Sequence, residues 1–410
     1  MFKKIKKCRI CFNKHLVNFF DLGNHQPSNS LKNKISDFIP SVPLGLTYCK
    51  NCKVVQLSAT ADPKFLFEEY VWVTGTSEGA NKYSNIFYKN IVERHNKKNL
   101  FVCEIASNDG TFLQKFKSKG HKVLGVDPAK NISKIANKNG IPTIAKFFDE
   151  NLSNQIMKKH GKADVIFARN VIPHVEQIHS IAKGIDNLIK QDGLVAIEFH
   201  YSKKILEELH YDSIYHEHLF YFSIKTITNF FKKYGLYSYD VSPSPISGGS
   251  LVIYFSKRKN KKTNFYKKKI SLEKKIKLNN FVKWNNFSRD SLIHSKNLLE
   301  LIKKTHKSGK IFGYGASARS STLLNFSNIN SKYLDFIIDK NMLKNKKLTP
   351  GTNIKILHPK NIKKKVITEY KYCLLLAWNF KDEIIKDLKK LKFKGKIIVP
   401  LPRRIKIYEI

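Results

Sequence analysis

The sequence predicts an α/β protein in which a small metal-binding domain precedes two doubly wound units. Apolar strand-like runs alternate with helix-like runs over most of the 410 residues, and this alternation is typical of parallel sheets covered by helices. Two Cys-x-x-Cys pairs stand near the N-terminus, and a second strand-turn-helix unit begins at residue 311. Functional sites in doubly wound sheets lie at the carboxyl ends of the strands.

The first element is the cysteine-containing segment, for which we expect a domain over residues 1–66. Four cysteines in two short knuckles can surround one tetrahedral zinc ion. They are Cys8, Cys11, Cys49 and Cys52. A thioredoxin-like redox pair is the alternative, but such a pair follows a strand in a βαβ unit and does not explain two pairs. Four protein ligands leave no open position, so the zinc is expected to be structural.

The first doubly wound unit follows a mostly helical stretch over residues 64–98. A helix is expected over residues 111–119. Strands are expected over residues 99–106, 121–126, 163–168, 193–199, 236–241 and 251–255. The alternation of these elements predicts a parallel sheet.

A lysine-rich segment over residues 257–310 separates the two units. Helical spacing over residues 270–302 predicts helices that cover the sheet, with a partly solvated spacer as the alternative. The second unit then starts with a strand and a glycine-containing turn at residue 311. Its later strands are expected over residues 336–339, 372–379 and 395–399.

The composition excludes several classes of protein. The chain has 75 Lys and Arg against 32 Asp and Glu, a net charge of +43, and 42% hydrophobic residues, which excludes disorder by composition. No apolar run approaches the roughly 20 residues of a membrane span. The basic N-terminus lacks the apolar core of a signal peptide because cysteines interrupt it. We therefore expect a cytoplasmic protein with no membrane partner.

The positive charge is scattered and is carried by lysine, since only eight residues are arginine. A nucleic-acid-binding protein concentrates its charge on one face and uses arginine for bidentate contacts. We therefore expect no nucleic-acid partner, although the field would attract an anionic small substrate. A monomer is compatible with the sequence, which leaves the oligomeric state open.

The turn after the first strand of the unit has the features of a nucleoside site. Glu104 to Gly110 form this turn, and Asp127 stands 17 residues beyond Gly110 at the end of the next strand. An acidic residue there can accept both ribose hydroxyls. A dinucleotide would need a turn richer in glycine, whereas Glu104 and Asp109 suit the cationic amino-acid end of S-adenosylmethionine (SAM). The turn therefore favours SAM over NAD.

The densest group of reactive side chains follows the strand over residues 193–199. It consists of Tyr215, His216, Glu217 and His218. Histidine suits proton transfer near neutral pH, and a carboxylate can orient it. Metal ligation by the two histidines and a structural hydrogen-bonded cluster are the alternatives. Asn170 and His174 follow the strand that starts at residue 163, so we expect both to face the same cleft.

These segments together resemble the sugar C-methyltransferases that act on nucleotide-linked 4-keto-deoxysugars. The resemblance covers essentially the whole chain. Its segments are the four knuckle cysteines and residues 104–110, 212–223, 313–325, 350–352, 378–380 and 400–402. Each segment alone is of modest specificity, but the combination is highly specific.

The resemblance implies three domains and two cofactors. A zinc-binding domain over residues 1–66 would precede a class I methyltransferase domain over residues 67–258 that binds SAM. A helical connector and a Rossmann-like domain over residues 259–410 would help to hold the nucleotide-sugar. A base would remove the proton from C-3, next to the 4-keto group, and the enolate would take the methyl group.

The resemblance also implies roles for single residues. His218 resembles the general base, with Tyr215 and Glu217 beside it and His174 reaching in. Tyr70 resembles a residue that lines the cleft, with ordinary packing as the alternative. The implied cofactor-binding residues are Glu104, Ala106, Asn108, Gly110, Asp127 and Asn170. The residues alone do not separate His216 from His218 as the base.

The chain departs from the family pattern at two places. Ala106 stands where a second glycine is more usual, which is tolerable if its backbone torsion is not left-handed. Residues 319–321, Arg-Ser-Ser, stand where a Lys-Gly-Asn-like stretch is typical. Arg319 could bind a phosphate bidentately. Two other functions remain open: an NAD(P)-dependent oxidoreductase or epimerase of nucleotide-sugars, and an RNA-modifying methyltransferase.

Overall fold

The N-terminal region is built around an antiparallel sheet that a distant part of the chain completes. The computed structural model describes residues 2–67, 72–95 and 97–410. Strands β2 (Leu16–His25), β3 (Val42–Cys49) and β4 (Val55–Leu57) lie in the order β11-β4-β3-β2. Strand β11 (Phe220–Tyr221) pairs with β4 and directly follows the segment that contains His218. Strands β1 (Phe2–Lys4) and β5 (Ala59–Ala61) form a separate pair.

The central region is a seven-stranded sheet in the order β12-β13-β10-β9-β6-β7-β8. Its strands are β6 (Phe101–Ile105), β7 (Lys122–Val126), β8 (Thr143–Ile144), β9 (Ala163–Arg169), β10 (Ile189–His200), β12 (Tyr237–Ser244) and β13 (Ser250–Ser256). The helices that accompany this sheet are α1 (Pro63–Phe67), α2 (Glu78–His95), α3 (Leu113–Lys117), α4 (Lys130–Lys138), α5 (Glu150–His160), α6 (Ile178–Leu188), α7 (Ser202–Glu208) and α8 (Ile224–Lys232).

The expectation of a wholly parallel sheet is wrong at one edge. Strand β13 is antiparallel to both β10 and β12. The connection between β12 and β13 is too short for the crossover that a parallel pair requires. Gly248 and Gly249 adopt φ values of 76° and 131° in this connection, which glycine permits at low cost.

The C-terminal region is a six-stranded sheet in the order β16-β15-β14-β17-β18-β19. The strands are β14 (Ile311–Tyr314), β15 (Phe336–Ile338), β16 (Lys355–Leu357), β17 (Tyr372–Leu375), β18 (Lys396–Val399) and β19 (Lys406–Glu409). Only the pairing of β19 with β18 is antiparallel among these described strands. The accompanying helices are α11 (Ala318–Phe326), α12 (Lys364–Ile367) and α13 (Lys381–Lys390).

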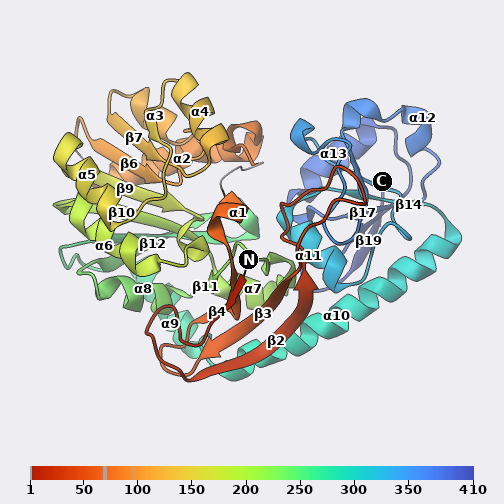
Figure 1. The fold of residues 1–410 in the computed structure, drawn as a ribbon, viewed down its shortest axis with the longest axis horizontal. Helices are drawn as coiled ribbons and strands as arrows, with labels where there is room; N and C mark the ends of the chain where they lie inside the picture. The colour runs from red at the N-terminus through yellow and green to blue at the C-terminus, as the bar shows by residue number, and fades with distance from the viewer. Residues whose placement is uncertain (1, 68–71, 96) are drawn as a thin grey trace.

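The lysine-rich connector forms two helices with different roles. Helix α9 (Asn264–Lys275) packs against α8 and β12, as expected for a helix that covers the sheet. Helix α10 (Phe281–Ser308) instead runs along the base of the molecule, from the N-terminal sheet to the C-terminal region (Figure 1). The rings of Phe287 and Phe20 lie 5.9 Å apart where α10 crosses β2. Helix α10 therefore supports two domains.

The three regions share one core. A single cluster of buried apolar residues includes members of the N-terminal sheet, the central sheet and the C-terminal sheet. The central and C-terminal regions lie on either side of the N-terminal sheet (Figure 1). No helix among the described residues is long and apolar enough to cross a membrane.

Candidate active site

The four knuckle cysteines converge on one point. All four Sγ atoms lie within 4.8 Å of one another. Gln56 Nε2 donates to Cys8 Sγ at 3.1 Å, and the backbone N–H of Ile10 donates to the same sulfur at 3.4 Å. Donors of this kind stabilise thiolate ligands, so the site fits zinc. Within residues 2–67, 72–95 and 97–410, no other group of three or more Cys, His, Asp or Glu side chains could hold a metal ion.

The turn after β6 has three residues with positive φ. Ala106, Asn108 and Gly110 have φ values of 53°, 51° and 79°. A Cβ atom on Gly110 would lie 2.8 Å from the side chain of Ile141, so only glycine fits there. Ala106 does not meet the condition on which its substitution for glycine was expected to be tolerable, because its torsion is left-handed. The turn keeps its shape despite this cost.

Asp127, which was expected to accept the ribose hydroxyls, directly follows β7. Its Oδ2 atom accepts from the backbone N–H of Asn108 at 2.8 Å, and its Oδ1 atom accepts from that of Ala129 at 2.9 Å. Burial raises the pKa of Asp127, and the two backbone donors oppose this effect. The carboxylate is therefore fixed in position, and each oxygen retains a second lone pair for a hydroxyl group.

A buried network of charged groups joins the ends of β6, β9 and β10. Arg169 Nε donates to Glu198 Oε2 at 3.1 Å, and Asn170 Nδ2 donates to Glu198 Oε1 at 2.9 Å. Glu104 lies 3.9 Å from Arg169 Nη1, and its Oε2 atom has no partner among the described residues. Burial raises the pKa of Glu104 well above its ordinary value, while Arg169 opposes the rise.

This network bears on the cofactor in two ways. The unpartnered Oε2 of Glu104 is an acceptor that the amino group of SAM would satisfy, so the residues fit the cofactor. Asn170, expected at the cofactor, uses its amide on Glu198. Sequence reasoning did not single out Glu198. Its signal was an acidic residue within the otherwise apolar run over residues 193–199.

The segment before α2 covers the cofactor turn. Asn108 Oδ1 accepts from the backbone N–H of Thr74 at 2.8 Å, and Asn108 Nδ2 donates to the carbonyl of Trp72 at 3.0 Å. Asp109 Oδ2 accepts from the backbone N–H of Gly75 at 2.8 Å. Tyr70, expected to line the cleft, lies outside the described residues.

His218 is held by hydrogen bonds to both of its ring nitrogens. Nδ1 lies 2.7 Å from the carbonyl oxygen of Ser213, and Nε2 lies 2.6 Å from the hydroxyl of Tyr215. A carbonyl oxygen only accepts, so Nδ1 carries the proton and Nε2 accepts from Tyr215. The ring of His174 lies 4.7 Å away, edge to face. The structure thus brings together His218, Tyr215 and His174.

His216 and Glu217 face the N-terminal region instead. His216 Nε2 donates to the carbonyl of Val42 at 3.0 Å, and its Nδ1 atom has no partner among the described residues. Glu217 Oε1 accepts from Asn29 Nδ2 at 2.5 Å. The turn over residues 215–218 therefore sends neighbouring side chains to different domains, and this geometry separates the two histidines.

The imidazoles of His218 and His174 are neutral near pH 7. Burial, and then the proximity of His174, lower the pKa of His218 well below its ordinary value, while the hydrogen bond to Ser213 opposes the shift. Burial lowers the pKa of His174 to about 4. A neutral imidazole can act as a base through the lone pair of Nε2, which here accepts from Tyr215.

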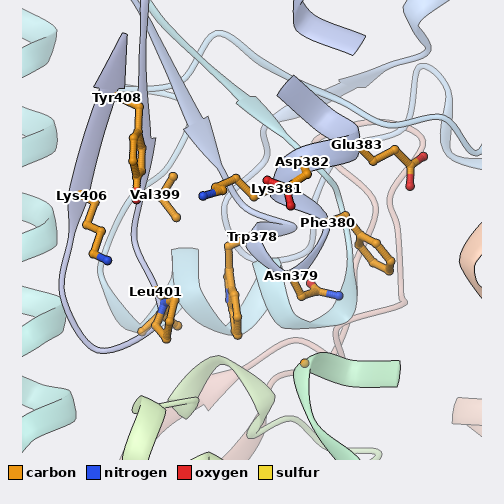
Figure 2. Close-up of a pocket in the computed structure, with 12 residues that line it drawn as sticks. Trp378, Asn379, Phe380, Lys381, Asp382, Glu383, Val399, Leu401, Lys406 and Tyr408 are labelled. Atoms are coloured by element: carbon orange, nitrogen blue, oxygen red, sulfur yellow. The ribbon is translucent and has the colours of Figure 1, made fainter. Parts of the chain in front are cut away.

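A cavity lies at the carboxyl ends of β17 and β18. It has a volume of about 470 Å³. Figure 2 shows Trp378 and Tyr408 on its walls, together with Lys381 and Lys406. Arg319, expected to be available for a phosphate, instead forms a two-point ion pair with Asp212.

Comparison with known proteins gives matches along almost the whole chain. Three family models match in succession: a zinc binding domain over residues 8–67, a methyltransferase domain over residues 85–241 and a C-methyltransferase C-terminal domain over residues 245–402. The C-methyltransferase NovU of Streptomyces niveus is 29% identical over 407 residues, which cover 98% of this chain and 96% of that protein.

Solved structures resemble only part of this chain. Magnesium protoporphyrin IX methyltransferase from Synechocystis PCC 6803 with bound SAM is 12% identical with a TM-score of 0.33, covering 43% of this chain and 80% of that chain. A SAM-dependent methyltransferase from Clostridium acetobutylicum is 14% identical with a TM-score of 0.35, covering 44% and 93%. Both TM-scores are low, so the relationship rests on the family models and NovU.

Proposed function

We propose that this chain methylates C-3 of a nucleotide-linked 4-keto-deoxysugar. The premise is that the chain is a SAM-dependent C-methyltransferase with a zinc-binding N-terminal domain and a C-methyltransferase C-terminal domain. The product would be a branched sugar. We also assign residues 1–66, 67–258 and 259–410 as its three domains. The 29% identity with a C-methyltransferase over nearly the full length supports a related reaction.

The observation that carries the proposal is the state of His218. Its Nδ1–H is committed to Ser213, so Nε2 holds the one lone pair that can take a proton. A ketone at C-4 acidifies the C-3 proton, which a neutral imidazole can then remove. Because the Tyr215 hydroxyl donates to Nε2, the hydroxyl proton would pass to Nε2 while the Tyr215 oxygen takes the proton from C-3. The chain thereby generates a nucleophilic carbon at C-3.

The cofactor would bind at the carboxyl ends of β6, β7 and β9. Glu104 would accept from the amino group, Asp127 would accept from the ribose hydroxyls, and Asn170 would line the site at the end of β9. The backbone of the turn that contains Ala106, Asn108 and Gly110 would contact the nucleoside. When bound there, SAM supplies a methyl group on a sulfonium centre to the C-3 carbanion.

The remaining site residues hold or line the cleft. We assign His174 to the wall beside His218, because its ring packs edge to face on that imidazole. Glu217 and His216 fix the catalytic segment against the N-terminal domain through Asn29 and Val42. Tyr70 remains a proposed cleft residue on the resemblance alone.

The nucleotide would occupy the cavity of the C-terminal domain. The aromatic ring of Tyr408 suits stacking of a base, and Lys381 and Lys406 suit a pyrophosphate (Figure 2). Arg319 does not serve this purpose, because Asp212 occupies its guanidinium.

The comparisons bear differently on the two alternative functions. The chain is a methyltransferase, so an NAD(P)-dependent oxidoreductase or epimerase is not its class. An RNA-modifying methyltransferase is disfavoured, because the C-terminal third matches a C-methyltransferase domain. The net charge of +43 was its main support.

A pair of histidine variants tests the assignment of the base. His218→Asn should abolish both methyl transfer and exchange of the C-3 proton with deuterated water, while the affinity for SAM is retained. His216→Asn should keep proton exchange and lose stability, since His216 bonds only to the Val42 carbonyl. Proton exchange that survives in His218→Asn, or disappears in His216→Asn alone, would move the base elsewhere.

A further inference from the structure

The segment that carries His218 belongs to the central region, but side chains of the C-terminal domain hold it by hydrogen bonds. Arg319 of α11 donates from Nε to Asp212 Oδ2 at 3.0 Å and from Nη2 to Asp212 Oδ1 at 2.7 Å. The indole Nε1 of Trp378 donates to the same carboxylate at 2.8 Å. Asp212 is fully buried. Three charge-assisted hydrogen bonds therefore fix its position.

A second grip lies two residues further along the segment. Thr322, one helical turn after Arg319 on α11, donates from its hydroxyl to the carbonyl of Ile214 at 2.7 Å. This hydroxyl is buried. Asp212 and Ile214 flank Ser213, whose carbonyl accepts Nδ1–H of His218 at 2.7 Å. The peptide that sets the tautomer of His218 is thus held on both sides by α11.

A third link holds the start of the segment. The Tyr211 hydroxyl donates to Nδ1 of His294 at 3.0 Å, and Nε2 of His294 donates to the carbonyl of Pro400 at 2.8 Å. His294 belongs to α10, and Pro400 follows β18 in the C-terminal domain. These hydrogen bonds to residues 211–214 therefore all come from outside the methyltransferase domain.

We propose that Arg319 and Thr322 are positioning residues for His218: by fixing the Ser213 carbonyl, α11 keeps the proton of the imidazole on Nδ1 and keeps Nε2 as the acceptor that bonds to Tyr215. A histidine with the wrong tautomer presents a donor where the reaction needs an acceptor, and activity is lost although the ring is in place. The role of His218 as base rests on the proposed function, whereas the control of its tautomer does not.

The first test compares two identical substitutions. Thr322→Val removes the hydroxyl that holds Ile214. Thr305→Val on α10 removes another buried hydroxyl, which donates to the backbone carbonyls of Leu301 and Ile302. The two proteins are labelled with ¹⁵N in the histidine rings, and the signals of His218 are identified by their loss in His218→Asn. The spectra report which ring nitrogen carries the proton.

We expect His218 to be protonated on Nδ1 in the wild type and in Thr305→Val, and to shift toward Nε2–H in Thr322→Val. The rate of C-3 proton exchange and kcat should fall about 10- to 100-fold in Thr322→Val, which is the cost of a misplacement near 1 Å, while the affinity for SAM is unchanged. Spectra of His218 that are the same in all three proteins would overturn the proposal.

A second pair of variants keeps the test decisive if Thr322→Val fails to fold. Arg319→Gln removes the ion pair with Asp212, and Arg319→Lys restores the charge without the two-point geometry. Arg319→Lys should recover part of the Nδ1–H signal and of kcat. Equal spectra for wild type and Arg319→Gln would refute the role of Arg319. If the wild type exchanges no C-3 proton, the proposed function fails, and the imidazole spectra still decide the positioning role.

Discussion

Ala106 shows how one residue can bear a cost that the fold imposes. The turn after β6 requires a φ of 53° there, and a side chain with a Cβ atom disfavours this conformation by about 1 kcal/mol relative to glycine. The neighbouring strand and the bonds around Asn108 hold the turn in place. The cost is therefore borne by the stability of the whole domain.

Replacing this alanine with glycine should stabilise the protein. Ala106→Gly is expected to raise the free energy of unfolding by about 1 kcal/mol, as measured by denaturant titration. Ala136→Gly is the matched control, because Ala136 lies within α4, and it should lower the free energy of unfolding by about 1 kcal/mol. A loss of stability in both variants would contradict the cost assigned to the left-handed torsion.

The low pKa of His218 predicts an unusual pH dependence. Burial disfavours the charged imidazole, so His218 stays neutral as the pH falls through about 6.5, where an ordinary histidine gains its proton. The rate of C-3 proton exchange should therefore hold steady down to pH 6 and decline only below it. An acid limb centred near pH 6.5 or above would show that His218 is not buried as described, or is not the base.

The residue types predicted the chemistry of the site, but they did not predict the directions in which its side chains point. Two imidazoles, a carboxylate and a phenol in four residues pointed to proton transfer. Which histidine faces the cleft depends on the bonds to Val42 and Ser213. These are backbone carbonyls, which carry no signal in the sequence. Arg319 was misjudged for a related reason, because its partner Asp212 lies 107 residues earlier.

At the scale of elements, the knuckle over residues 8–12 is joined to α6 by His179. Nε2 of His179 donates to the carbonyl of Arg9 at 2.9 Å, and the ring of Phe12 stacks on the imidazole at 4.6 Å. The thiolates of Cys8 and Cys11 set the shape of this knuckle when zinc is bound. Zinc is thereby connected to the packing between two domains.

Removing zinc should loosen this contact and leave the cofactor site intact. After treatment with a chelator, amide hydrogen exchange should rise in residues 8–57 and at the start of α6, because the knuckle loses its closed form. The affinity for SAM, measured by calorimetry, should stay within about twofold, since the turn after β6 does not touch the knuckle. Unchanged amide exchange after verified loss of zinc would contradict a structural role.

The elements differ in how far the sequence could predict them. Long apolar strands such as β6, β9 and β10 were located correctly, because continuous burial leaves a clear apolar run. The direction of β13 was wrong, since pairing direction depends on the length of a connection that has little signal of its own. Strand β11 contains only Phe220 and Tyr221 and gave no periodic pattern, so its addition to the N-terminal sheet was not foreseen.

At the scale of the whole molecule, the folded protein contains many buried histidines that are neutral. Burial is the largest cause of a lowered pKa in all of them. They include His25, His174, His200, His210, His216, His218 and His294. Three buried carboxyls, those of Glu104, Asp127 and Glu273, have raised pKa values. Their effect on the pH dependence of stability is opposite to that of the histidines. The histidines are the larger group.

Acid should therefore destabilise the protein earlier than usual. Below about pH 6.5 these histidines bind protons in the unfolded chain but not in the folded protein. Each such histidine adds up to about 1.4 kcal/mol per pH unit to the slope of the free energy of unfolding against pH. The free energy of unfolding should thus fall as the pH drops from 7 to 5, through the window between the unfolded pKa and the folded values, which are about 4 for His174 and His216. A free energy that stays constant over this window would contradict the buried, neutral state of these rings.

Exchange of the C-3 proton is the most direct test of the proposed reaction. The purified protein is incubated in deuterated water with a panel of nucleotide-linked 4-keto-6-deoxysugars, with and without SAM, and the sugars are analysed by mass spectrometry. We expect deuterium at C-3 of one sugar without SAM and a product heavier by one methylene group only when SAM is present. The absence of both deuterium uptake and methylation of any keto-sugar, in a protein that binds SAM, would contradict the proposed reaction.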